Sequence, residues 1–182
     1  MTGFNENTTQ EKMENDLSKL FAQLNGNQGV ATVMKPDFVA CDLNEMTVTV
    51  ECPVREWQTN PYKTMHGGYI ASAFDETAGI FATYMSGMKS LVTANLSVNY
   101  LKPIMINDSI LITAKATSVG KRIITVTGEC RSKSGGSLTG TAQMTFAVRF
   151  DPERPEQAKQ WQMSSDIIME IDKDSMGNRP NG

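Results

Sequence analysis

The feature that most restricts the fold is a series of segments in which apolar and polar residues alternate. In residues 92–100, every second residue from Val92 is apolar or aromatic, and the residues between them are polar. The same period runs through residues 46–54, 109–119, 124–130 and 138–148, and we expect it to begin at Val30. A period of two with short, turn-like connections predicts an antiparallel sheet that is apolar on one face. That apolar face needs a cover.

Residues 67–87 are predicted to supply the cover, because they lack the period of two and are apolar on more than one side, as in a buried helix. At helical spacing, large side chains share one face: Ile70, Phe74, Thr77, Phe81, Tyr84 and Met85. Small residues and one carboxylate share the other: Gly68, Ala71, Ser72, Asp75, Ala78, Gly79, Ala82 and Ser86. We therefore predict an α+β protein, in which a curved antiparallel sheet of five to six strands wraps one long central helix.

A second, amphipathic helix is predicted before the sheet, over Thr9–Asn25. Its apolar residues follow helical spacing: Met13, Leu17, Leu20, Phe21 and Leu24. A chain of 182 residues suits one domain of ordinary size. We expect a polar tail and this helix in residues 1–27, the main domain in 28–151, and a partly disordered extension in 152–182.

The composition excludes several kinds of site. His66 is the single histidine, so a three-histidine zinc centre and an HExxH helix are both impossible. The cysteines are three, widely spaced and without a CxxC pair, which argues against a disulfide framework and indicates a reducing compartment. A net charge of −3 does not favour a nucleic-acid partner, and no apolar run is long enough to span a membrane. We expect a cytoplasmic protein without a metal.

Two acidic residues stand out in the predicted central helix. Asp75 and Glu76 are the only charged residues between Lys63 and Lys89. Asp75 lies on the small-residue face, and a carboxylate there without a partner or a task would cost several kcal/mol if buried. Two readings stay open: Asp75 has a chemical role, or both acids lie on a solvated helix edge, where Asp75 could also cap a neighbouring backbone. Glu76 is interpreted as structural.

The residues before this helix point to chemistry at its N-terminus. His66-Gly67-Gly68 leaves backbone N–H groups uncovered by side chains at the positive end of the helix dipole. Such a site can stabilise a developing oxyanion on an acyl carbonyl. The alternative is that the two glycines only allow a tight turn into the helix.

The run His66–Asp75, HGGYIASAFD, resembles the signature of hotdog-fold acyl-CoA thioesterases of the phenylacetate-pathway (PaaI-like) type. In that family HGG opens the long helix, and a catalytic Asp or Glu follows nine residues after the histidine. Asn60 matches a position that contacts the thioester or water, and Thr93 matches a Ser or Thr near the attacking water. The resemblance covers about residues 58–150, including the strand that ends in Leu101-Lys102-Pro103.

The resemblance implies a mechanism and an assembly. The Gly67 N–H would polarise the thioester carbonyl, with His66 shaping the site. Asp75, supplied by the other subunit of a homodimer or a dimer of dimers, would activate water or attack directly. The CoA thioester is the substrate, and no cofactor is implied.

Binding residues are predicted less directly. Gly68, Tyr69 and Lys63 lie around the helix start, and Lys121 and Arg122 occupy a turn that could bind CoA phosphates or could simply be a solvated hairpin. The chain departs from the family at two positions. Lys63 replaces a frequent glycine, and Gly79 stands where some members have Ser or Thr.

A non-catalytic hotdog module that binds acyl-CoA or another acyl ligand as a sensor or regulator remains an alternative function. A hydratase ranks last, because it would need a histidine deeper in the pocket than His66.

Overall fold

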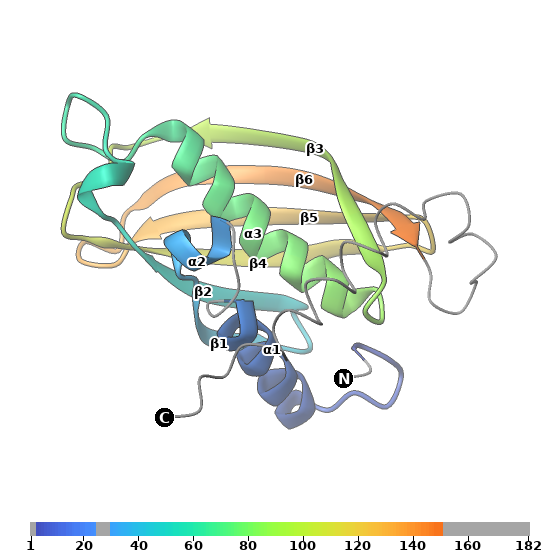
Figure 1. The fold of residues 1–182 in the computed structure, drawn as a ribbon. Coiled ribbons are helices and arrows are strands. Elements are labelled where there is room, and N and C mark those ends of the chain that lie inside the picture. Colours follow the sequence, from blue (N-terminus) through green and yellow to red (C-terminus); the bar gives the residue numbers. More distant parts are fainter. Residues whose placement is uncertain (1–2, 25–29, 151–182) are drawn as a thin grey trace, which may run out of the picture. The chain divides into compact units, whose positions relative to one another are not determined.

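The alternating segments form one six-stranded sheet in the computed structural model, which describes residues 3–24 and 30–150. The order across the sheet is β1-β2-β4-β5-β6-β3, and neighbouring strands run antiparallel (Figure 1). The strands are β1 Asp37–Asp42, β2 Thr47–Pro53, β3 Ser90–Tyr100, β4 Ser109–Val119, β5 Ile123–Ser132 and β6 Leu138–Phe150. The predicted extension over residues 152–182 lies outside the described residues.

In residues 3–24 and 30–150, four helical segments accompany the strands: α1 Gln10–Leu24, α2 Val30–Met34, the 3-10 turn η1 Glu56–Gln58, and α3 Gly67–Met85. The expectation that a period of two begins at Val30 is wrong for α2, because its two buried residues, Ala31 and Met34, are three apart, as on one face of a helix. No helix in the described part of the chain is long and apolar enough to cross a membrane.

Helix α3 lies across one face of the sheet (Figure 1). All six residues of its predicted large-residue face are buried, and they form the core with the inward side chains of the strands. On the small-residue face, Ala78 and Ala82 are also buried, whereas Ser72, Asp75 and Gly79 keep partial access to solvent. The helix ends before Gly87, whose φ of +76° is the left-handed conformation that favours glycine after a helix.

Phe74 of α3 packs closely over Gly128 of β5. A Cβ atom at Gly128 would lie 2.8 Å from two ring carbons of Phe74. The missing side chain therefore lets the aromatic ring lie directly on the backbone of the central strands.

Helix α1 is attached to the domain along its length. Met13, Leu17 and Phe21 form a fully buried stripe at helical spacing. The Gln10 amide donates to the carbonyl of Cys41 at 2.8 Å and accepts from the N–H of Leu43 at 2.8 Å, which joins the start of α1 to the β1–β2 turn.

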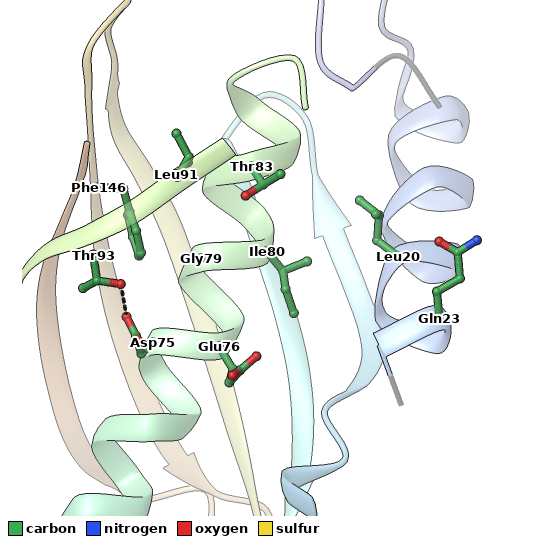
Figure 2. Close-up of a pocket in the computed structure, with 10 residues that line it drawn as sticks. All are labelled: Leu20, Gln23, Asp75, Glu76, Gly79, Ile80, Thr83, Leu91, Thr93 and Phe146. Carbon is green, nitrogen blue, oxygen red and sulfur yellow. Dashed lines mark hydrogen bonds between the residues drawn. The ribbon is translucent and has the colours of Figure 1, made fainter. Parts of the chain in front are cut away.

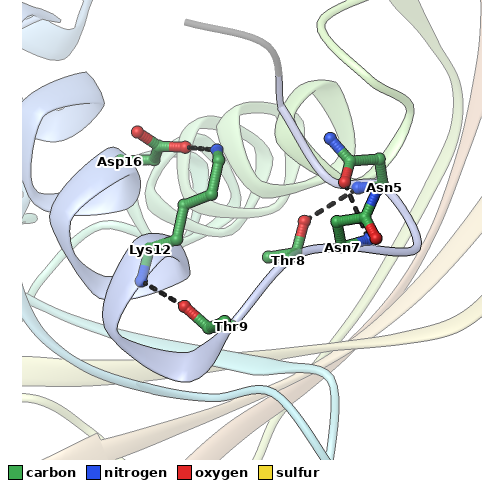
Figure 3. A network of polar contacts seen from close by, with 6 residues as sticks. All are labelled: Asn5, Asn7, Thr8, Thr9, Lys12 and Asp16. Carbon is green, nitrogen blue, oxygen red and sulfur yellow. Dashed lines mark hydrogen bonds and ion pairs between the residues drawn. The ribbon is translucent and has the colours of Figure 1, made fainter.

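The chain before α1 is ordered by short-range hydrogen bonds, shown in Figure 3. Thr9 accepts the N–H of Lys12 on its hydroxyl, as an N-cap does, and the Lys12 ammonium pairs with Asp16 one turn later. The Phe4 N–H donates to the Tyr84 carbonyl at 2.9 Å, so the N-terminal segment is also tied to the end of α3.

We predict that Gly128→Ala lowers the free energy of unfolding by about 1–3 kcal/mol, because the Phe74 ring must move away from the added methyl group. Urea denaturation measures the change. Gly135→Ala is the control, since a Cβ atom there meets its nearest neighbour at 3.6 Å, an ordinary contact. Equal stability of the two variants would contradict the proposed packing constraint.

Candidate active site

Asp75 and Thr93 meet in the structure. Asp75 lies in the third turn of α3 and is half-buried, and Thr93 belongs to β3. The Thr93 hydroxyl donates to Oδ1 of Asp75 at 2.8 Å (Figure 2). This bond holds the carboxylate in one orientation. Its second oxygen has no protein hydrogen-bond donor among the described residues, so that oxygen can act on another molecule.

The contact depends on a change of phase along β3. Leu96 and Val98 pack against the core, as the alternating pattern predicts, but Val92 is 41% exposed. At the start of the strand the odd-numbered residues Leu91 and Thr93 face α3 instead. Strict alternation would have turned Thr93 away from Asp75.

Asp75 and Thr93 open into a cavity of about 420 Å³ between α1, α3, β3 and β6, which we term the acid cavity. Its lining is Leu20, Gln23, Asp75, Glu76, Gly79, Ile80, Thr83, Leu91, Thr93 and Phe146. The volume lies within the range of small-molecule sites.

The start of α3 presents an unpaired donor. His66 is the N-cap, and its Nδ1 accepts the Gly68 N–H at 3.0 Å. Tyr69 and Ile70 N–H groups return to the His66 carbonyl. The Gly67 N–H has no such partner among the described residues. It is therefore free to donate to an anion or to a polarised carbonyl oxygen at the positive end of the helix.

Tyr100 holds this helix start, a role that the sequence did not reveal. Its hydroxyl donates to the Gly67 carbonyl at 3.0 Å. Its ring lies so close that a Cβ atom on Gly67 would be 3.2 Å from Cζ. The contact joins β3 to the first turn of α3, 33 residues apart in sequence.

Asn60 and Gly67 line a second cavity of about 430 Å³, which we term the amide cavity. Its lining is Asn60, Thr64, Met65, Gly67, Ile70, Tyr100, Leu101, Lys102, Pro103 and Ile104. The Asn60 side chain stabilises its own turn, because it accepts the N–H of Tyr62 at 2.9 Å and donates to the Thr64 hydroxyl at 2.9 Å.

Buried Gln58, another residue missed at the sequence level, secures the same turn. Its Oε1 accepts the Arg55 N–H at 2.7 Å, and its carbonyl accepts the His66 N–H at 2.8 Å.

The acid and amide cavities have no lining residue in common. Asp75 follows Gly67 by eight helical residues, which corresponds to about 12 Å along the axis. An attacking group and an oxyanion donor must both lie about 3 Å from one reacting centre. A single copy of the chain therefore cannot bring Asp75 and its own Gly67 together on one carbonyl.

At the position where the family often has glycine, Lys63 adopts a backbone conformation that favours glycine. Its φ is +62°, a left-handed conformation that costs a non-glycine residue about 1 kcal/mol. Its N–H donates to the Asn60 carbonyl at 3.0 Å and closes the turn that carries Asn60. The exposed Lys63 side chain lies outside the lining of both cavities.

Four other predicted binding residues also lie outside the two cavities: Gly68, Tyr69, Lys121 and Arg122. Tyr69 packs edge-on against Trp57, with ring centroids 5.0 Å apart. Lys121 and Arg122 are exposed in the β4–β5 turn. That turn lies after the end of β4. Helix α3 begins near the other end of β4, because the N–H of Met65, just before α3, donates to the carbonyl of Ile104, which precedes β4. The 11 residues of β4 separate the two places by about 33 Å within one copy of the chain.

Glu76 also lines the acid cavity. Burial, with a further contribution from the charge of Asp75, raises the pKa of the Glu76 carboxyl above its ordinary value of 4.5. In the described residues, no group of three or more His, Cys, Asp or Glu side chains is placed to hold a metal ion.

Comparison with known proteins assigns the family. A model of the thioesterase superfamily matches residues 62–139. A protein of Saccharolobus solfataricus, whose name assigns it provisionally to the esterases, is 31% identical over 99 residues, which are 54% of this chain and 70% of that protein. Human acyl-coenzyme A thioesterase 13 is 26% identical over 98 residues, 54% of this chain and 70% of the human protein. The chain belongs to the thioesterase superfamily.

The fold agrees with this assignment. The crystal structure of zebrafish thioesterase superfamily member 2 superposes with a TM-score of 0.66 at 22% identity, covering 78% of this chain and 99% of the zebrafish chain. The predicted hotdog architecture, with a central helix, a six-stranded antiparallel sheet and an added N-terminal helix, is confirmed.

We predict that Glu76→Gln raises the free energy of unfolding at pH 7.5 and that the gain disappears near pH 4. The raised pKa means that the folded state prefers protonated Glu76, so its stabilising contribution is complete below the ordinary value of 4.5 and is lost as the pH rises through the folded-state pKa. Urea denaturation at several pH values tests this.

Glu129→Gln is the matched control, because Glu129 is exposed and pairs with Arg131. Glu129→Gln removes this ion pair and should lower the free energy of unfolding at pH 7.5, by at most about 1 kcal/mol. If Glu76→Gln changes the free energy of unfolding by the same amount at every pH, the raised pKa of Glu76 is contradicted.

Proposed function

We propose that this protein hydrolyses acyl-CoA or aryl-CoA thioesters to the free acid and CoA, with Asp75 as general base or nucleophile and the Gly67 N–H as oxyanion donor. The main support is the arrangement of Asp75, which is held by Thr93 and lines the acid cavity. The similarity to human acyl-coenzyme A thioesterase 13 supports the choice of a CoA thioester.

The geometry fits two routes for the reaction. In the first, Asp75 takes a proton from water while the water oxygen bonds to the thioester carbon. In the second, the carboxylate itself bonds to that carbon and forms a mixed anhydride, which water then hydrolyses. In both, the carbonyl oxygen becomes negative and accepts the Gly67 N–H, and the C–S bond breaks to release the CoA thiolate, which is protonated.

The separation of Asp75 from Gly67 in one protomer supports an active site shared by two copies of the chain. Strand β3 is the last strand of the sheet and pairs on one side only among the described residues. In a homodimer, an antiparallel β3–β3 contact would cover this edge and bring the Asp75 of one copy toward the Gly67 of the other. A dimer of dimers is compatible with the same site.

The remaining predicted residues have supporting roles in this proposal. His66 caps α3, Gly68 leaves room for the His66 ring, and Asn60 lies with Gly67 in the amide cavity. Tyr69, Lys63, Lys121 and Arg122 stay predictions for substrate binding. The free cysteines Cys41, Cys52 and Cys130 support a reducing compartment such as the cytoplasm.

Asp75→Asn is predicted to lower kcat for acyl-CoA hydrolysis by about 10²-fold or more, because the amide neither accepts a proton nor attacks the carbonyl. Steady-state release of free CoA, measured over a panel of acyl-CoA and aryl-CoA substrates, tests this. Equal rates for both proteins would remove Asp75 from the mechanism. Tight acyl-CoA binding without turnover by the unmodified protein would favour the non-catalytic module instead.

Subunits of Asp75→Asn mixed with subunits of an inactive Gly67 variant test the shared site. If each site takes Asp75 from one copy and Gly67 from the other, a mixed dimer keeps one intact site, and statistical exchange restores about a quarter of the unmodified activity. No recovery, with exchange verified by differential labelling, would place the site within one protomer.

Gly67→Pro is the inactive Gly67 variant for the mixing experiment, and it also tests the oxyanion donor directly. Proline lacks the N–H but is favoured at the first helical position, and extended His66, with ψ of 136°, accommodates a following proline. We expect kcat to fall about 10²–10³-fold relative to Gly67→Ala, which brings a Cβ atom toward Tyr100 but keeps the N–H. Equal kcat values for the two variants would exclude this N–H as the oxyanion donor.

A further inference from the structure

Helix α1 contributes to the cavity that contains the candidate catalytic acid. Leu20 and Gln23 of α1 line the acid cavity across from Asp75 and Thr93, as Figure 2 shows. Leu20 is half-buried and packs against the core. The N-terminal helix is therefore a wall of the site and not only an addition to the surface.

The apolar part of the acid cavity comes from four different elements. Leu20 belongs to α1, Ile80 to α3, Leu91 to β3 and Phe146 to β6. Such a lining favours an apolar guest, and the volume of about 420 Å³ is sufficient for a small or medium-sized one.

The chemistry at Asp75 indicates which part of the substrate enters this cavity. The thioester carbon must lie against the Asp75 oxygen or against a water bound to it, so both substituents of that carbon start at the cavity. The CoA substituent carries charged phosphates and is stabilised by solvent or by cationic groups, which the lining of the cavity lacks. The acyl substituent is the part that an apolar wall can stabilise.

We propose that the acid cavity receives the acyl group of the substrate and that α1, through Leu20, limits the length of the chain that fits. The inference rests on the proposed thioesterase function and extends it to substrate selection. Helix α1 lies outside residues 62–139, the segment matched by the superfamily model, so this wall is not part of the matched family core.

The attachment of α1 makes it suitable for this role. The buried stripe of Met13, Leu17 and Phe21 fixes the rotation of the helix, and the two hydrogen bonds of Gln10 to the β1–β2 turn fix its start. Leu20 is therefore held at a defined depth in the cavity. A larger or smaller side chain at position 20 changes the space available to the guest more than it changes the position of α1.

The experiment compares Leu20→Trp and Leu20→Ala with the unmodified protein on saturated acyl-CoAs of increasing chain length. We expect Leu20→Trp to lower kcat/KM for the longest accepted chains by about tenfold or more relative to short chains, and Leu20→Ala to shift the optimum to longer chains. Ala22→Trp is the control, because Ala22 is exposed on the same helix and is absent from the cavity lining, so its profile should not change.

Calorimetric titration with non-hydrolysable thioether analogues of the same acyl-CoAs separates this inference from the proposed function. Chain-length-dependent binding that shifts in the Leu20 variants supports the acyl cavity even if no substrate is hydrolysed, in which case the thioesterase proposal alone fails. An unchanged chain-length profile in both Leu20 variants, by hydrolysis and by binding, overturns the role of α1 while leaving the hydrolytic function intact. Absence of both hydrolysis and binding overturns both.

Discussion

The packing of α3 on the concave face of one sheet is the interaction on which the rest of the structure depends. The large face of α3 supplies much of the core, and the contact of Phe74 with the backbone at Gly128 brings the helix close to the central strands. Because the large face of α3 is buried against the sheet, the residues that keep access to solvent, including Asp75, lie on the opposite face. The same packing therefore stabilises the domain and exposes Asp75 beside β3.

A single rigid helix also imposes a separation on the candidate chemistry. The free N–H of Gly67 is available because the first turn of a helix has no internal acceptor for it, and Asp75 lies more than two turns further on. Both groups are held firmly, by Tyr100 at one place and by Thr93 at the other. The firm positions make a shared site between two copies a geometric requirement of the proposed mechanism.

Much of the architecture could be predicted because periodicity reports burial directly. The period of two located most of the strands, and the two faces of α3 could be separated by residue size. The prediction was wrong at Val30–Met34, where a short helix, and not a strand, buries apolar residues. It also missed the change of phase in β3, since alternation at an edge strand with mixed exposure does not specify which residues face the helix.

The candidate site likewise has one part that the sequence predicted and another that it did not. The sequence by itself determined that the chain has a glycine-opened helix with one acid on its small face, because local spacing controls which residues share a helix face. Only the tertiary structure decided that Thr93 orients Asp75, that Tyr100 holds Gly67, and that Leu20 of α1 reaches the same cavity. These contacts join residues far apart in the chain, and their geometry depends on sheet twist, strand phase and helix docking, which local pattern does not encode.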